Sequence, residues 1–410
     1  MVPAESNKHR NINRDTYTVI EKAHQRSWWL VRFALISTVF GGTLLGSLNL
    51  ALIHILYTRN ISLVHAHGFL QLFGFVLPIA MGMALRLMPP SRIQSAAVLE
   101  RFIFFFVSIG VPLYLLGYIW ENNIQFFGII FVILGVGCFL RLLLSGLLRG
   151  KSRLPPPTVL AYCSAGFLSI SLASNLISDS PEMMYTSFLY GFTLSLVSSV
   201  VINMAPSLVG SPSLPHWVRK VTILIPLGVI AELATFEKLG TCLWSLGTIV
   251  LTLAMLRRGG PPREPLTAER VRICCFWLLL SALTRLMMLI SPTLSHTLVA
   301  DASRHIYTIG FLMQLIFVML SYLTKAFEAQ ELSHPNLFRL GLALLNASLF
   351  FRLFQIMAAY TGTWGLYFSG VSGVISWFAV LFLVISIWQT LSTTSVKSVI
   401  GIGRTNKENE

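Results

Sequence analysis

Long apolar runs recur along the whole chain, and they limit it to folds that a lipid bilayer can accept. The clearest run, residues 63–90, reads LVHAHGFLQLFGFVLPIAMGMALRLMPP. About 20 consecutive apolar residues are enough for a helix to cross the hydrocarbon core of a bilayer. Since 55% of the 410 residues are hydrophobic and only 11% are charged, the composition excludes a soluble domain and indicates an integral membrane protein.

The hydrophobic pattern predicts twelve membrane-spanning helices in an all-α polytopic bundle. They cover residues 29–57, 61–88, 102–120, 124–148, 158–178, 183–209, 220–238, 239–256, 271–292, 304–327, 337–360 and 363–390. Residues 29–390 thus form one transmembrane domain. The segments 1–28 and 391–410 are predicted to be a cytoplasmic N-terminal segment and a cytoplasmic tail.

Lysine and arginine residues gather on one side of this arrangement. The two termini and the connections after even-numbered spans carry 23 of the 30, whereas the opposite side carries Arg59, Lys238 and Arg304. By the positive-inside rule, both termini are therefore expected in the cytoplasm. The charge is spread over many short connections and forms no single patch, which argues against nucleic acid as a partner. The lipid bilayer is the partner that the composition implies.

The second span carries two histidines within its first turns, His65 and His67. An ionisable group inside a membrane is costly, so it normally faces a bundle interior, a water-filled cavity or a cofactor. At about 100° per residue, the two side chains point to nearly opposite faces and cannot bind one metal from the same side. Gln71 lies one turn below His67. The five cysteines form no CxxC or CxxCH motif, so any haem would be held by histidine alone.

The second span also resembles a known membrane helix. His67-Gly68, with Pro78, Gly82 and Pro89 spaced behind it, looks like the second transmembrane helix of the haem–copper oxidase main subunit. With His65-Ala66 directly before this motif, the segment is more similar to the NnrS family of haem- and copper-containing polytopic membrane proteins linked to nitric oxide. The resemblance implies twelve helices in pseudo-threefold four-helix units. Spans two, six and ten agree weakly with such a repeat, because each has a Phe-Leu pair near its start, at 69–70, 188–189 and 311–312.

A haem b held between two helices needs one imidazole from each, at matching depth. His67 and His305 meet this requirement, and in the resemblance helices two and ten supply the pair. Tyr307 stands where a second histidine of helix ten is expected. The alternative is that each histidine lies at the membrane interface near a helix N-terminus and bonds a loop carbonyl.

Haem propionates need cations at the same level of the membrane. Arg285 in span nine and Arg352 in span eleven both fall in the outer halves of their spans, where an unpaired guanidinium is costly. Bidentate pairing with propionate carboxylates would solve this. The alternative partner is Glu232, which can fully match only one of the two arginines.

Copper is the second metal that the resemblance implies. His65, together with His54 and His296, would place two or three imidazoles on the outer side, a ligand set that copper accepts. The alternative is that these are separate interfacial histidines.

Span six has no histidine and span seven has no His-His pair, so the three-histidine copper site of oxygen-reducing oxidases is absent and the chain is not a terminal oxidase. The resemblance implies haem-based nitric oxide metabolism or tolerance in a bacterial inner membrane, and the fold analogy suggests oxidoreduction with a quinol or cytochrome donor. The alternative is a secondary transporter of twelve spans with a substrate and ion site at Arg285, Arg352 and Glu232.

Overall fold

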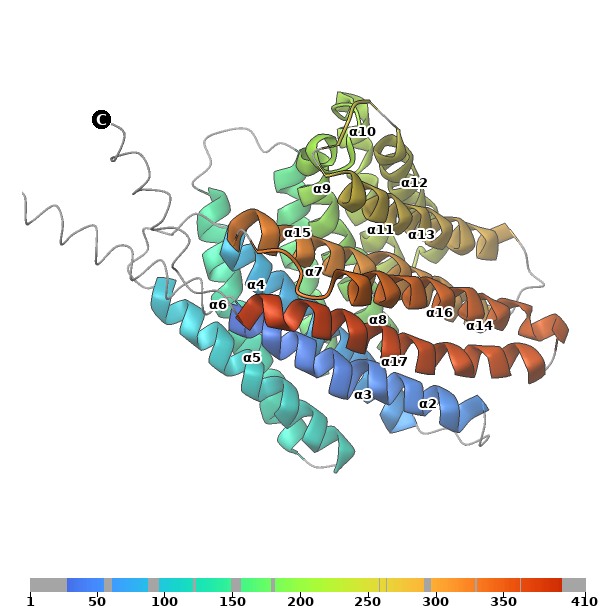
Figure 1. The fold of residues 1–410 in the computed structure, drawn as a ribbon. Coiled ribbons are helices and arrows are strands. Elements are labelled where there is room, and N and C mark those ends of the chain that lie inside the picture. Colours follow the sequence, from blue (N-terminus) through green and yellow to red (C-terminus); the bar gives the residue numbers. More distant parts are fainter. Residues whose placement is uncertain are drawn as a thin grey trace, which may run out of the picture.

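The computed structural model describes residues 28–54, 61–87, 96–120, 123–148, 156–177, 181–257, 259–262, 264–290, 296–328, 330–361 and 363–392. Within these ranges every regular element is a helix (Figure 1). Eleven of the helices described there are long and apolar enough to cross a membrane, and the first of them is Trp28–Leu52. The predicted all-α polytopic fold is therefore confirmed. The predicted cytoplasmic segments 1–28 and 391–410 lie outside the described residues except at 28, 391 and 392.

Spans one to five contain eight named elements. These are η1 (Thr38–Thr43), α2 (Leu44–His54), α3 (Ile61–Phe69), η2 (Leu70–Val76), α4 (Leu77–Leu87), α5 (Ala96–Ile119), α6 (Ile124–Leu148) and α7 (Pro156–Ile177). The remaining elements are α8 (Pro181–Tyr185), η3 (Thr186–Thr193), α9 (Leu194–Val209), α10 (His216–Val221), α11 (Leu224–Leu233), α12 (Glu237–Leu256), α13 (Pro265–Ile290), α14 (His296–His305), η4 (Ile306–Met313), α15 (Gln314–Glu328), α16 (Pro335–Thr361) and α17 (Thr363–Ser392).

The seventh predicted span, residues 220–238, is the one that departs from a regular membrane helix. It begins with the last two residues of α10, turns at residues 222–223, continues as α11 and ends in the first two residues of α12. The ten residues of α11 rise only about 15 Å, roughly half of the hydrocarbon core. α11 packs tightly on α12, since a Cβ at Gly228 would lie 2.6 Å from the carbonyl oxygen of Gly240. The chain reverses at residues 234–236, three residues before the predicted boundary at 238–239.

Thr235 makes this reversal with a left-handed backbone, φ 72°. A β-branched side chain in this region costs about 1–2 kcal/mol. Thr235→Gly is therefore expected to raise the free energy of unfolding by about 1 kcal/mol. Thermal unfolding in detergent measures the gain. Thr235→Ala is the control, because it keeps the Cβ and should gain less; equal stability of the wild type and Thr235→Gly would contradict the argument.

Four of the helices contain π-helical segments, and three of these segments meet inside the bundle. η2, η3 and η4 lie in spans two, six and ten, the spans with the Phe-Leu pairs. Phe73 of η2 packs edge-on against Phe188 of η3 with ring centroids 5.1 Å apart. The hydroxyl of Tyr307 in η4 donates to the carbonyl oxygen of Leu189 in η3, 3.1 Å away. π-helical turns are rare and occur frequently at functional sites.

The first and last spans lie side by side and close the bundle (Figure 1). Ser47 of α2 donates to the carbonyl oxygen of Gly373 in α17 at 2.6 Å. Trp377 Nε1 of α17 donates to the carbonyl oxygen of Val39 in η1 at 3.1 Å. Side chains that are far apart in sequence, in spans one, two, ten, eleven and twelve, can therefore line one internal space.

Candidate functional site

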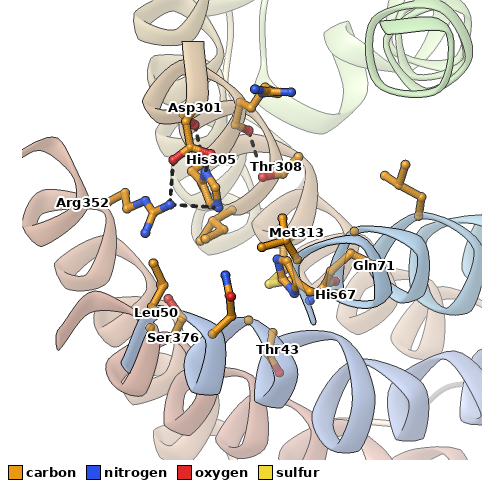
Figure 2. A pocket seen from close by; sticks show the side chains of 18 of the residues that line it. Thr43, Leu50, His67, Gln71, Asp301, His305, Thr308, Met313, Arg352 and Ser376 are labelled. Atoms are coloured by element: carbon orange, nitrogen blue, oxygen red, sulfur yellow. Dashed lines mark hydrogen bonds and ion pairs between the residues drawn. The ribbon is translucent and has the colours of Figure 1, made fainter. Parts of the chain in front are cut away.

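A cavity of about 630 Å³ lies in the half of the bundle where span one ends and span two begins. Its walls come from α2, α3 with η2, α8 with η3, α14 with η4, α16 and α17. This volume falls within the range of roughly 300–1,000 Å³ that is usual for pockets that bind small molecules and cofactors. The predicted ligand residues His67 and His305 both line the cavity, and Figure 2 shows them reaching it from different helices.

His67 is held by the π-helical part of span one. Its Nδ1–H donates to the carbonyl oxygen of Gly42, 2.6 Å away. The ring lies close against Gly46, where a Cβ would come within 2.5 Å of the imidazole Cε1. A carbonyl can only accept, so this contact puts the proton of the neutral ring on Nδ1 and leaves the lone pair on Nε2.

His305 has the same tautomer, fixed within its own helix. Its Nδ1–H donates to the carbonyl oxygen of Asp301 at 2.8 Å, and the Asp301 carboxylate lies 3.4 Å from the same nitrogen. Nε2 of His305 lies 3.4 Å from Nη2 of Arg352. Both histidines thus direct Nδ1 to backbone oxygen and keep Nε2 as the atom that can bind a ligand.

Arg352 is buried, with 6% of its surface exposed, and it is held by two partners besides His305. Nη2 donates to the carboxylate of Asp301 at 2.7 Å, and Nη1 donates to the hydroxyl of Ser369 at 3.0 Å. Figure 2 shows Asp301, His305 and Arg352 as one connected group. The ion pair with Asp301 offsets the cost of placing a guanidinium inside the membrane.

Asp301 was not among the predicted site residues. The hydrophobic pattern begins span ten at residue 304, whereas α14 begins at His296. The polar stretch 296–303 reads as a loop by hydropathy, although it is helical here. The available signal was the spacing of four residues between Asp301 and His305, which places the two side chains on one helix face.

A second ion pair bridges spans six and ten at the cavity wall. Nη1 of Arg304 donates to both carboxylate oxygens of Glu182, each 3.1 Å away. The guanidinium lies 5.7 Å from the ring centroid of Tyr185, and all three residues line the cavity. The lysine and arginine count placed Arg304 on the outer side, at the first residue of the predicted span ten, and sequence reasoning missed Glu182.

Two further predicted residues lie in the cavity wall. Gln71 accepts a hydrogen bond from Thr38 Oγ1 at 3.5 Å. His65 also lines the cavity, and its ring centroid is 6.1 Å from that of Tyr118. The cavity therefore extends around the start of α3, so that side chains expected on nearly opposite faces both reach it.

Arg285 and Tyr307 lie elsewhere. Arg285 Nη2 pairs with the carboxylate of Glu232 at 3.2 Å, and Trp244 Nε1 donates to the same carboxylate at 2.9 Å. The Tyr307 hydroxyl lies 2.7 Å from Thr193 Oγ1. Neither Arg285 nor Tyr307 is among the described residues that line the cavity. Arg285 thus has the alternative partner that the sequence allowed, and its contact with a haem propionate stays a prediction.

The same geometry separates the three residues of the transporter alternative. Arg352 lies in the cavity wall with Asp301, whereas Arg285 and Glu232 form their own pair between α13 and α11. They do not make the single substrate and ion site that this alternative needs.

The predicted copper ligands fall partly beyond what can be described. The side chains of His54 and His296 lie outside the described residues. Among the side chains that the structure does describe, no group of three or more His, Cys, Asp or Glu could hold a metal ion. Copper bound by His65 with these two residues stays a prediction.

The fold and the cavity define a class: a polytopic α-helical membrane protein with an internal cavity lined by histidines. No protein-family model matches the chain, and no curated protein matches it. The resemblance to the NnrS family therefore stays a prediction from the sequence pattern of the second and tenth spans.

Loss of the buried Glu232 carboxylate tests the assignment of Arg285. Glu232→Gln leaves the guanidinium in the bundle without a counter-charge, and we expect a loss of about 3–5 kcal/mol in the free energy of unfolding. Denaturant unfolding in detergent measures it. The control is Glu264→Gln, which breaks a more exposed ion pair with Lys325 at 3.1 Å and should cost less than about 1 kcal/mol. Equal losses in the two variants would contradict the assignment.

Proposed function

We propose that this protein binds b-type haem through His67 and His305 and acts in nitric oxide metabolism or tolerance. The observation that carries the proposal is that both imidazoles line one cavity with Nδ1 already bonded to a backbone carbonyl. Histidines that ligate metals almost always donate their other ring N–H to a carbonyl, carboxylate or water, because this fixes the tautomer and the ring orientation. His305 has this arrangement within its own helix, and His67 has it through the Gly42 carbonyl of span one.

The size and lining of the cavity also fit a flat, largely apolar group. Its volume of about 630 Å³ is adequate for a large cofactor. Its apolar walls include Leu72, Phe75, Ile309 and Leu312. Apolar walls exclude water and favour burial of a macrocycle.

If His305 binds a metal, its contact with Arg352 has to break. Nη2 of Arg352 lies 3.4 Å from His305 Nε2, the atom whose lone pair a metal would take. The shorter bonds to Asp301 and Ser369, 2.7 and 3.0 Å, can keep the guanidinium in place. Arg352 is then available to a porphyrin carboxylate, which is the role proposed for it here.

When bound, the haem would supply an iron that exchanges one electron and can take nitric oxide as a ligand. The protein's residues would hold this iron, orient it through the two carbonyl-bonded imidazoles and exclude water around it. A quinol or a cytochrome as electron donor, and copper as a second metal, belong to the proposal through the fold analogy. A bacterial inner membrane with both termini in the cytoplasm is proposed from the resemblance and from the lysine and arginine distribution.

The test is an absorbance spectrum of the protein purified in detergent after expression with added haem precursor. We expect a reduced α-band of b type, and a pyridine haemochrome assay to identify the haem. His67→Ala and His305→Ala should each remove the band or convert it to a high-spin spectrum. His65→Ala tests the neighbouring cavity histidine and His216→Ala tests an exposed one on α10; both should keep the low-spin band.

A colourless wild type would overturn the haem proposal. A coloured His67→Ala variant with an unchanged low-spin spectrum would overturn the assignment of this ligand. Nitric oxide binding is tested on the reduced protein by electron paramagnetic resonance, where a ferrous nitrosyl signal is expected, and its absence in a haem-loaded protein would contradict the nitric oxide part of the proposal.

A further inference from the structure

One corner of the cavity contains two buried polar atoms without partners. Asn49 of α2 is only 8% exposed and Arg352 of α16 only 6%. Oδ1 of Asn49 and Nε of Arg352 are buried and have no hydrogen-bond partner among the described residues, and both residues line the cavity. A buried polar group left without a partner costs about 1–3 kcal/mol, and such groups are normally satisfied.

α17 contacts both of the helices that carry these two residues. Ser369 of α17 accepts the bond from Arg352 Nη1, and Gly373, one turn further along α17, accepts the bond from Ser47. Ser47 precedes Asn49 by two residues on α2. Arg352 and α2 therefore contact neighbouring turns of α17, and Asn49 lines the same cavity as Arg352. Figure 2 shows Arg352 together with Leu50 and Ser376 on the side of the cavity away from His67.

We propose that this corner is a carboxylate-binding subsite for a ligand whose remaining body is apolar. Nε–H of Arg352 needs an acceptor, and a carboxylate gives a charge-assisted bond to it. The Asn49 amide can turn about its last side-chain bond, which lets Nδ2–H donate to the second carboxylate oxygen. Nη2 of Arg352 stays bonded to the Asp301 carboxylate when the ligand binds. The subsite uses Nε–H, a donor that this ion pair does not occupy.

The inference rests on the proposed function where the carboxylate is that of haem. The same chemistry, a carboxylate on an apolar body, is also carried by a fatty acid. Two pairs of probes distinguish these sources: haem against haem dimethyl ester, and lauric acid against methyl laurate. Each pair differs only in whether the carboxylate is free.

The experiment measures the affinity of the purified, haem-free full chain for each probe in detergent, by absorbance for the porphyrins and by thermal shift for the laurates. We expect the wild type to bind haem at least tenfold more tightly than its dimethyl ester. Asn49→Leu should reduce this preference several-fold, and Asn49→Asp should reverse it, because a second carboxylate repels the first. Asn203→Leu makes the same change at an exposed position on α9 and should keep the full preference.

Each outcome decides one claim. Equal affinity for the acid and the ester in both pairs, or an unchanged preference in both Asn49 variants, overturns the subsite. Preference for haem over its ester, with no preference between the laurates, supports the subsite and assigns it to a porphyrin. Preference for lauric acid in a protein that binds no haem supports the subsite and overturns the haem proposal.

Discussion

The bilayer offers no water to bond polar groups, and this single constraint determines both the fold and the site. Every backbone N–H and C=O inside the membrane must be satisfied within the protein, so the described spans are helices. The same constraint applies to side chains. Glu232 with Arg285, and Asp301 with Arg352, are paired inside the bundle. In the cavity wall, Asn49 and Arg352 keep buried polar atoms that have no partner among the described residues.

The π-helical segments connect the helix scaffold to the cavity. η1 supplies the Gly42 carbonyl that orients His67, and η4 follows directly after His305. η2 and η3 add Gln71 and Leu189 to the cavity wall. A π turn changes the rotation of every residue that follows it, so that side chains can face a cavity that a regular helix would turn them away from. The π-helical segments therefore form part of the cavity wall, and regular helices such as α2, α14, α16 and α17 form the rest.

Much of this arrangement could be predicted from the sequence, and the rest depends on pairing between helices. Hydropathy alone gives the spans, and the depth of His67 and His305 predicts that they share a site. The hydropathy pattern cannot decide whether Arg285 or Arg352 reaches the cavity, because both arginines lie at comparable depth in apolar spans. Only the arrangement of the helices, in which α12 packs against both α11 and α13, brings Glu232 to Arg285. Asp301 was missed because the polar residues in the first turns of α14 put the predicted start of span ten at residue 304. Asn49 was missed because the sequence does not show that its side-chain oxygen lacks a hydrogen-bond partner in the folded protein.

The pairing of α2 with α17 also sets an order of assembly. The cavity takes walls from spans one, two and six and from spans ten to twelve, and residues 369–373 of α17 bond both Arg352 of α16 and Ser47 of α2. Spans enter the membrane from the N-terminus onwards as the chain is synthesised. The helix that completes the cavity thus leaves the ribosome after every other helix that lines it. Any ligand held there must be loaded after α17 has been made, into a chain whose first spans are already in the membrane.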